Sequence, residues 1–280
     1  MTEPAVARIV RNALAEDAPW GDVTSDALIP PGTRARARLV ARDGGVLSGL
    51  DAFREAFAQT DPRIDVHLRA QEGDSFSPGD ELARVDGPAR GVLTAERVAL
   101  NLVQRMSGIA ALTSRYVDAV SGTPARIADT RKTTPGLRVL ERQAVRAGGG
   151  RNHRFSLSDA VMAKDNHLAV LAGRDLTAAL RTAFRPLPHT MHVEVEVDRL
   201  DQIEPVLAAG VDTIMLDNFS LDDLEAGVRQ IAGRATVEAS GGVSLDMVAA
   251  IARTGVDVIS VGALTHQAQS IDLGLDIEVG

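Results

Sequence analysis

The sequence contains no cysteine among its 280 residues, so disulfides, thiolate catalysis and zinc sites with cysteine ligands are excluded. Aromatic residues make up only 3% of the chain, which leaves few side chains for stacking on nucleic-acid bases. No apolar run approaches the roughly 20 residues of a membrane-spanning helix. The acidic start, MTEPAVARIVRNALAEDAP, does not resemble a signal peptide. We therefore expect a soluble, cytoplasmic protein that binds neither nucleic acid nor membrane.

Lysine is also nearly absent, because Lys132 and Lys164 are the only two lysines among 30 basic residues. Both lie in the stretch DTRKTTPGLRVLERQAVRAGGGRNHRFSLSDAVMAKDNH, residues 129–167. Residues 131–164 hold eight basic residues and two acids, a local charge of +6 in a chain whose formal net charge is −8. An ammonium and a guanidinium are not interchangeable at a binding site. The pattern indicates a site for a small, multiply charged anion, with chance placement of the two lysines as the alternative.

The first third of the chain predicts a small α+β domain. Arginines alternate with Ala35, Ala37 and Leu39 in TRARARL, which is typical of a strand with one face exposed to water. Turn-rich strands follow, and Thr94 is a candidate N-cap for a long helix that ends near residue 119. Arg97, Asn101 and Arg105 recur at every fourth position of that helix, and we expect their shared face to be solvated by default.

After Gly122 the pattern changes to alternating strands and helices. Strands are expected at 125–129, 160–164, 191–197, 212–217, 235–240 and 257–262. Helical spacing fills the gaps between them, and this alternation favours a parallel sheet. Six clear strands are fewer than the eight of a closed barrel, so we expect an incomplete or seven-strand α/β barrel. A doubly wound sheet is the alternative.

Each predicted strand ends in a group that can act on a ligand. These ends are Asp129, Lys164, Glu196, Asp217, Ser240 and Gly262. Ligands of parallel α/β folds bind where the carboxyl ends of the strands converge, so six such ends in succession predict one shared site.

The last two ends suggest a phosphate cradle, formed by Ser240-Gly241-Gly242 and by Val261-Gly262-Ala263 with His266 close by. Glycine lets the backbone approach an anion closely. Glu196 and Asp217 end neighbouring strands and could hold Mg²⁺, which prefers oxygen ligands. An amphipathic edge strand is the simpler explanation of Glu194 and Glu196 in HVEVEV. Together these features indicate a phosphoribosyl pyrophosphate site next to a cationic pocket for a dicarboxylate.

At these residues the chain also resembles the quinolinate phosphoribosyltransferase family. The matching segments are TAERVALNLVQRMSGIA (94–110), the run 129–167, EVEVD (194–198), MLDNF (215–219), SGGVS (240–244) and VGALTH (261–266). The resemblance implies an N-terminal α/β sandwich domain over residues 1–110 and an incomplete, seven-strand barrel over 111–266. It also implies that the tail, residues 267–280, returns to the first domain.

The resemblance further implies roles for single residues. Lys132, Lys164, Glu196 and Asp217 would be catalytic, and Glu196 and Asp217 would hold Mg²⁺ directly or through water or substrate. The substrates would be bound by Arg97, Thr130, Arg131, Lys132, His153, Arg154, Lys164, Glu196, Asp217, Ser240, Gly241, Gly242, Val261, Gly262, Ala263 and His266. Arg131, Arg154 and Lys164 would clamp the two carboxylates of quinolinate. Arg97 would reach the site of the neighbouring subunit in a homodimer, which changes the reading of its helix face from solvent to interface.

The implied reaction converts quinolinate and phosphoribosyl pyrophosphate to nicotinate mononucleotide, pyrophosphate and CO₂ in NAD biosynthesis. Three alternatives stay open at this point. A related transferase could use another anionic base without decarboxylation, and release of CO₂ separates the two. A lyase could use Lys164 as a Schiff base, and a binding protein would have no activity.

Overall fold

The computed structural model describes residues 3–171 and 173–279, and Met1, Thr2, Ala172 and Gly280 lie outside the described residues. The chain forms two compact units. Unit 1 comprises Met1–Ser114, Thr133–Gly149 and Leu264–Gly280, and unit 2 comprises Arg115–Lys132 and Gly150–Ala263. The first division, after Ser114, lies four residues beyond the predicted boundary after residue 110, and both points are inside the long helix α4 (Ala89–Ala119). In the described part of the chain, the helices lack the length or the apolar character needed to cross a membrane.

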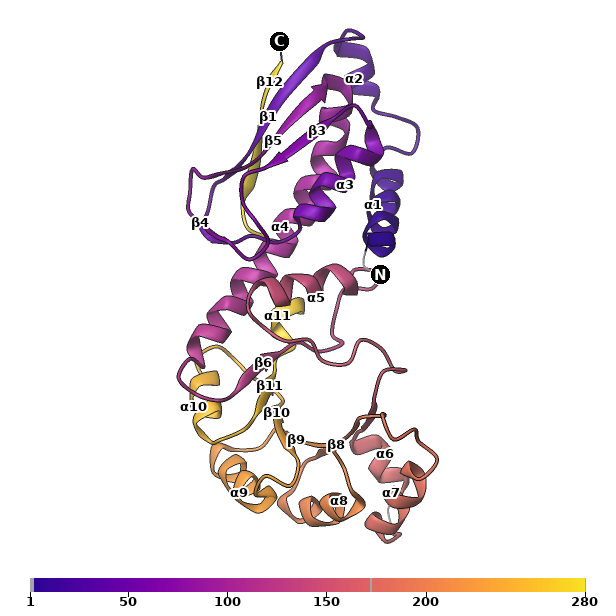
Figure 1. Ribbon diagram of the computed structural model, residues 1–280, viewed down its shortest axis with the longest axis vertical. Helices are drawn as coiled ribbons and strands as arrows, with labels where there is room; N and C mark the ends of the chain where they lie inside the picture. The colour runs from indigo at the N-terminus through magenta and orange to yellow at the C-terminus, as the bar shows by residue number, and fades with distance from the viewer. Residues whose placement is uncertain (1–2, 172, 280) are drawn as a thin grey trace. The chain divides into compact units, whose positions relative to one another are not determined.

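Unit 1 is built on a four-stranded antiparallel sheet in the order β12-β1-β5-β3. Its strands are β1 (Arg34–Ala41), β3 (Asp65–Leu68), β5 (Glu81–Pro88) and β12 (Leu273–Val279). The alternation of RARARL is confirmed, since Ala35, Ala37 and Leu39 are buried and the arginines between them are exposed. The C-terminal strand β12 pairs with β1 along its length, so the last strand of the chain lies beside a strand from its first third (Figure 1).

The other elements of unit 1 are α1 (Glu3–Asp17), α2 (Val23–Leu28), α3 (Leu50–Thr60), α5 (Arg138–Ala147), a two-stranded ladder of β2 (Gly45–Val46) and β4 (Ser75–Phe76), and most of α11 (Ala263–His266). The aromatic rings of Phe53 and Phe57 on α3 meet edge to face, with centroids 5.0 Å apart, and both side chains are fully buried. Aromatic pairs of this geometry add to the hydrophobic stabilisation of a core.

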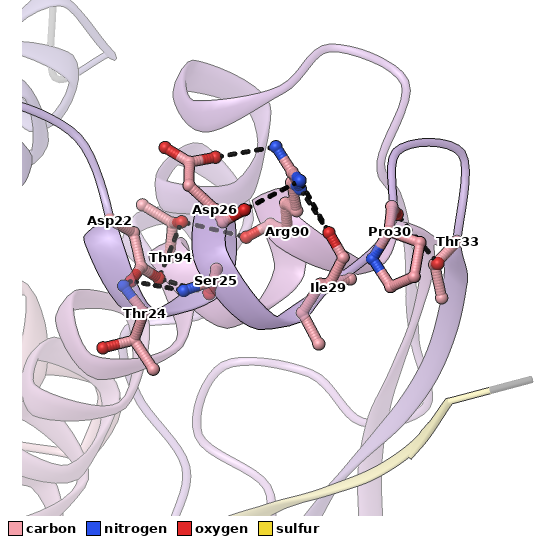
Figure 2. A network of polar contacts seen from close by, with 9 residues as sticks. All are labelled: Asp22, Thr24, Ser25, Asp26, Ile29, Pro30, Thr33, Arg90 and Thr94. Carbon is pink, nitrogen blue, oxygen red and sulfur yellow. Dashed lines mark hydrogen bonds and ion pairs between the residues drawn. The ribbon is translucent and has the colours of Figure 1, made fainter.

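Helix α4 begins five residues before Thr94, so the predicted N-cap was wrong. The Thr94 hydroxyl donates instead to the Arg90 carbonyl (2.9 Å) and to the Asp22 carboxylate (3.2 Å). Figure 2 shows the surrounding network, in which the Arg90 guanidinium also contacts Asp26 and the Ile29 carbonyl and so fixes α2 against α4.

Unit 2 is a six-stranded parallel sheet in the order β6-β11-β10-β9-β8-β7. Its strands are β6 (Arg126–Ala128), β7 (Val161–Ala163), β8 (Val193–Val197), β9 (Thr213–Asp217), β10 (Thr236–Ser240) and β11 (Val258–Ser260). The intervening helices are α6 (Asp165–Val170), α7 (Leu176–Phe184), η1 (Leu200–Gln202), α8 (Ile203–Ala209), α9 (Leu221–Ile231) and α10 (Val248–Arg253).

The strand order confirms an incomplete barrel and excludes the doubly wound alternative. Strands β7 to β11 are neighbours in chain order, and the first strand, β6, pairs with the last, β11. A doubly wound sheet would place its first strand in the middle. The strand count is slightly lower than expected, since Arg151 takes the place of a seventh strand with a single parallel bridge to Ala128.

Alternation along these strands separates an apolar layer from a polar lumen. Val195, Val197, Ile214, Leu216 and Val237 are almost completely buried, in the rows that face the helices. The opposite rows carry Glu194, Glu196, Met215, Asp217, Glu238 and Ser240, which line two cavities. Strand β8 is therefore not an edge strand; it lies between β7 and β9, and all five of its residues are buried.

Candidate active site

A cavity of about 500 Å³ lies in unit 2, at the carboxyl ends of the strands and the loops that follow them. It is lined by Thr130, Arg131, Lys132, His153, Arg154, Met162, Lys164, Glu196, Met215, Asp217, Asn218, Ser240, Gly241, Gly242 and Ser260. Ligands of parallel α/β folds bind at this edge of the sheet. We call this cavity the candidate site.

Eleven of the residues proposed from the sequence line the candidate site. They are Thr130, Arg131, Lys132, His153, Arg154, Lys164, Glu196, Asp217, Ser240, Gly241 and Gly242. Five others do not line it: Arg97, Val261, Gly262, Ala263 and His266. Arg97 is exposed on α4, and His266 is exposed at the end of α11. Val261 is buried at the end of β11, where its amide donates to the Ala128 carbonyl (2.9 Å).

Sequence reasoning missed four lining residues, Met162, Met215, Asn218 and Ser260. Met215 is two residues before Asp217 on β9, and the alternation that places Asp217 in the lumen could have identified it. Ser260 is 3% exposed, and its hydroxyl has no hydrogen-bond partner among the described residues. A buried hydroxyl in a cavity wall is ready to bond to a ligand.

Two guanidinium groups form the cationic part of the candidate site. Arg154 donates to the Ala160 carbonyl (2.9 Å), and burial together with the charge of Arg131 lowers the pKa of Arg154. The Nε atom of Arg131 is buried and lacks a hydrogen-bond partner within the described chain. The repulsion between the two guanidinium groups favours an anion between them, because an anion relieves it.

Asp129 organises the loop that carries His153 and Arg154. Its carboxylate is fully buried and accepts hydrogen bonds from the Asn152 side chain and from the His153 amide, both at 2.6 Å. A buried carboxylate needs such donors to offset its desolvation. The end of β6 thereby fixes the backbone from which both cationic side chains extend.

His153 belongs to a buried cluster with Glu194 and Glu238. Its Nε2 lies 3.2 Å from Glu194 and 3.5 Å from Glu238, and its Nδ1 lies 2.7 Å from the Arg154 backbone nitrogen. Burial alone would lower the pKa of His153, but the bonds to the two carboxylates raise it to about 10. Burial also raises the pKa of Glu194, with a further contribution from the charge of Glu238. His153 therefore retains a proton at neutral pH that an isolated imidazole would release.

A second cavity of about 470 Å³ lies next to the candidate site, and His153 and Arg154 line both cavities. Glu194 and Glu238 line only the second cavity. The three side chains lie close enough to share a metal ion. A protonated His153 donates from Nε2 to the neighbouring carboxylates, so the three side chains form a hydrogen-bonded cluster without a metal ion.

The carboxylate pair of the candidate site is Glu196 at the end of β8 and Asp217 at the end of β9. Lys164 forms an ion pair with Glu196, and the side-chain amide of Asn218 donates to the Asp217 carboxylate at 2.6 Å. Burial and the charge of Glu196 raise the pKa of Asp217, while Lys164 and Lys132 oppose that shift. A carboxylate whose ionisation is disfavoured by a neighbouring carboxylate gains from a hard cation that binds both.

The loop after β10 requires glycine for steric reasons. Gly241 has φ +93°, and a Cβ atom there would lie 2.2 Å from the Asn218 side-chain oxygen and 2.7 Å from its backbone nitrogen. The backbone amide of Asn218 donates to the Ser240 carbonyl (2.9 Å), which holds the loop after β9 against the loop after β10. This close backbone approach leaves the peptide groups of the loop accessible to a ligand in the candidate site.

Family models match nearly the whole chain. The model described as quinolinate phosphoribosyl transferase, N-terminal domain, matches residues 22–107, and the C-terminal domain model matches residues 109–276. The nicotinate-nucleotide pyrophosphorylase [carboxylating] of Mycobacterium leprae is 45% identical over 277 residues, which cover 96% of this chain and 95% of that protein. A probable enzyme of the same name from Bacillus subtilis is 38% identical, with 96% and 92% covered.

Solved structures agree with these matches. The nicotinate-nucleotide pyrophosphorylase of Francisella tularensis has a TM-score of 0.92 at 36% identity, with 99% of this chain and 97% of that chain covered. NadC from Streptococcus pyogenes has a TM-score of 0.92 at 40% identity, with 97% and 95% covered.

Proposed function

The chain belongs to the quinolinate phosphoribosyltransferase family, and we propose that the candidate site is where it carries out the family's reaction. It is a phosphoribosyltransferase of NAD biosynthesis that converts quinolinate and phosphoribosyl pyrophosphate to nicotinate mononucleotide, pyrophosphate and CO₂. The observation that supports the location best is the pairing of Arg131 and Arg154 beside the Glu196–Asp217 carboxylates in one cavity.

Quinolinate would occupy the cationic part of the candidate site. Its two carboxylates would accept hydrogen bonds from Arg131, Arg154 and Lys164, and the buried Nε of Arg131 would gain the partner that it lacks within the described chain. A planar guanidinium presents its donors in a fixed fork that matches a carboxylate. His153, held by its cluster, would form the floor below the pyridine ring.

Phosphoribosyl pyrophosphate would occupy the opposite part. Ser240, Gly241 and Gly242 would bind the 5′-phosphate together with the segment Val261-Gly262-Ala263, while Thr130 and Lys132 would lie near the pyrophosphate. The backbone amide of Lys132 donates to the Thr130 hydroxyl (3.1 Å), which fixes the backbone from which the lysine side chain extends. Charged donors held in place stabilise a leaving pyrophosphate without reorganisation during the reaction.

Glu196 and Asp217 would hold a magnesium ion. The donor set fits, because both groups are carboxylates and the raised pKa of Asp217 reports a pair that gains from a cation. The bound ion would neutralise charge on the pyrophosphate. The same carboxylates would stabilise positive charge at the ribose C1 as its bond to pyrophosphate breaks.

The remaining chemistry requires positioning rather than a covalent nucleophile. The pyridine nitrogen would attack C1, and the ring would become cationic, which favours loss of the adjacent carboxylate as CO₂. Lys164 would hold a carboxylate as an ammonium ion. Its ion pair with Glu196 disfavours the Schiff-base alternative, which needs a neutral amine.

We also propose a homodimer in which Arg97 of one subunit enters the candidate site of the other. Arg97 is exposed on α4 and does not line the site within its own described chain.

Because a chain without cysteine needs no oxidising compartment, we place the enzyme in the cytoplasm.

The test is to supply purified protein with quinolinate, phosphoribosyl pyrophosphate and Mg²⁺, and to measure CO₂ and pyrophosphate, with nicotinate in a parallel reaction. We expect equal release of both products with quinolinate only. Pyrophosphate without CO₂ would keep the phosphoribosyl site but reassign the base, and neither product from folded protein would contradict the proposal.

A further inference from the structure

Arg105, in the middle of α4, is largely buried, although its spacing with Arg97 and Asn101 predicted a solvated face. Its side chain is 25% exposed and makes three contacts, all within unit 1. The guanidinium donates to the Ala268 carbonyl (2.6 Å), to the Thr265 carbonyl, and to Glu141 Oε1 (3.1 Å). Arg105 therefore joins α4 to α5 and to the segment that contains α11.

Glu141 extends this network to a second segment. Its side chain is fully buried, and it accepts hydrogen bonds from the Thr134 amide (3.0 Å) and the Thr134 hydroxyl (2.8 Å). Such a carboxylate is stabilised only while its donors stay in place. The Arg105–Glu141 ion pair thus holds Thr134 on one side and Thr265 on the other.

Thr134 and Thr265 lie just after the two points at which the chain passes from unit 2 into unit 1, Lys132–Thr133 and Ala263–Leu264. The residues just before the first point are Thr130, Arg131 and Lys132 of the candidate site. Those before the second are Val261, Gly262 and Ala263, assigned above to the 5′-phosphate. Each threonine lies two residues beyond the last of these binding residues, and one residue adds at most about 3.5 Å of chain, so the position of the threonine limits how far that binding residue can move.

We propose that Arg105 is a positioning residue that sets the pyrophosphate-binding segment, 130–132, and the phosphate-binding segment, 261–263, at the same time. The inference rests on the proposed function, because that function assigns the two segments to the two ends of phosphoribosyl pyrophosphate. Arg105 itself touches no substrate. One guanidinium, with bonds to Thr265 and through Glu141 to Thr134, couples the geometry of both segments.

The test uses calorimetric titration of the full chain with inorganic pyrophosphate and, separately, with ribose 5-phosphate. Arg105→Lys keeps the charge but cannot reproduce three directed bonds, so we expect both ligands to bind about tenfold more weakly. Thr134→Val removes the hydroxyl bond to Glu141 and leaves Arg105 in place. We expect it to weaken pyrophosphate binding alone. Arg115→Ala, an exposed arginine on the same helix, is the control and should change neither affinity.

A folded Arg105→Lys protein that binds both ligands as tightly as wild type would show that the network only stabilises unit 1. Weaker binding of a single ligand would likewise overturn the coupling. If Arg105→Lys fails to fold, Thr134→Val decides, since unchanged pyrophosphate binding there would also overturn the inference. Wild-type protein that binds neither ligand would instead contradict the proposed function, so the two failures are distinguishable.

Discussion

The guanidinium of Arg154 should control the binding of quinolinate more than that of the phosphoribosyl donor. Arg154→Ala removes charge-assisted hydrogen bonds to a carboxylate, each worth about 1.5–3 kcal/mol, so we expect KM for quinolinate to rise about 10- to 100-fold. The KM for phosphoribosyl pyrophosphate should change much less. Steady-state kinetics with each substrate varied in turn measure both values.

Arg151 provides the matched control, because it lies in the same loop but its side chain is exposed and does not line the candidate site. Arg151→Ala should leave both KM values near wild type. An equal rise in both KM values for Arg154→Ala would argue against the assigned carboxylate clamp.

Asp217 should set the acid side of the pH profile. Burial and the charge of Glu196 raise its pKa, so it becomes protonated at a higher pH than an ordinary aspartate. Activity that requires the carboxylate should therefore fall as the pH decreases through this raised pKa. Mg²⁺ and protons compete for the same oxygens, so a higher Mg²⁺ concentration should move the acid limb of kcat/KM for phosphoribosyl pyrophosphate to lower pH. If the acid limb does not move with Mg²⁺ concentration, Asp217 does not bind the metal.

The same shift has a consequence for stability. A carboxyl group whose pKa is raised by folding destabilises the folded state at pH values above that pKa, and the penalty disappears as the pH falls through it. Asp217→Asn removes the penalty at neutral pH. We expect a higher Tm by calorimetry together with a loss of kcat of about 100-fold or more. A lower Tm would show that the Asp217 charge stabilises the fold.

At the scale of elements, the loop after β10 should tolerate substitution very unevenly. Gly241→Ala forces a Cβ atom against Asn218, and Gly242→Ala meets no atom within 4 Å, although both residues have positive φ. We expect Gly242→Ala to cost about 1 kcal/mol from backbone strain and Gly241→Ala several kcal/mol. Urea unfolding of the two variants measures the difference. Equal costs would show that Asn218 moves aside freely.

The strands and the main site residues could be predicted because both depend on local patterns. HVEVEV alternates with a period of two, which predicts a strand. Glu196 is at the carboxyl end of that strand, where ligands of parallel α/β folds bind. The same rule found Lys164, Asp217 and Ser240. Short helices such as α6 and α11 were missed, because four to six residues are too few to show a helical period.

Contacts between distant residues could not be predicted. Helical spacing identified the face that Arg105 occupies but not what covers it, since its carbonyl partners are 160 and 163 residues away in the chain. Met162 and Ser260 were missed for a related reason. Neither side chain carries a charge or a metal-binding group, so only the folded barrel shows that they face the candidate site.

At the scale of the whole molecule, one surface segment of unit 1 is unusually apolar. Trp20, Val23 and Leu28 are 93%, 77% and 73% exposed, and all three belong to α2 or the residues just before it. The network of Figure 2 holds this segment rigidly against α4, the helix that also carries Arg97. Rigid, exposed apolar side chains are typical of protein interfaces, which supports the proposed dimer.

Subunit complementation should reveal whether Arg97 acts in the neighbouring subunit. The Arg97→Ala subunit keeps its own candidate site intact but cannot donate the arginine. The Lys164→Ala subunit can donate Arg97 but lacks a lysine in its own candidate site. In a mixed dimer, the Arg97→Ala subunit receives Arg97 from the Lys164→Ala subunit, so one of the two sites is complete. Equal mixing of two inactive proteins after subunit exchange should restore about a quarter of wild-type activity, because half of the dimers are mixed.

A cis role for Arg97 predicts no recovery, because each subunit would then lack one essential group of its own. Trp20 is the only tryptophan, so its emission reports independently on the interface. We expect dilution into the monomer range to shift its emission to longer wavelength as the indole returns to water. Trp20→Asp should weaken the dimer and lower the recovered activity in the mixing experiment, while the fold of unit 1, to which this exposed side chain contributes little, stays intact. Recovery that is unaffected by Trp20→Asp would place the dimer contact elsewhere on the molecule.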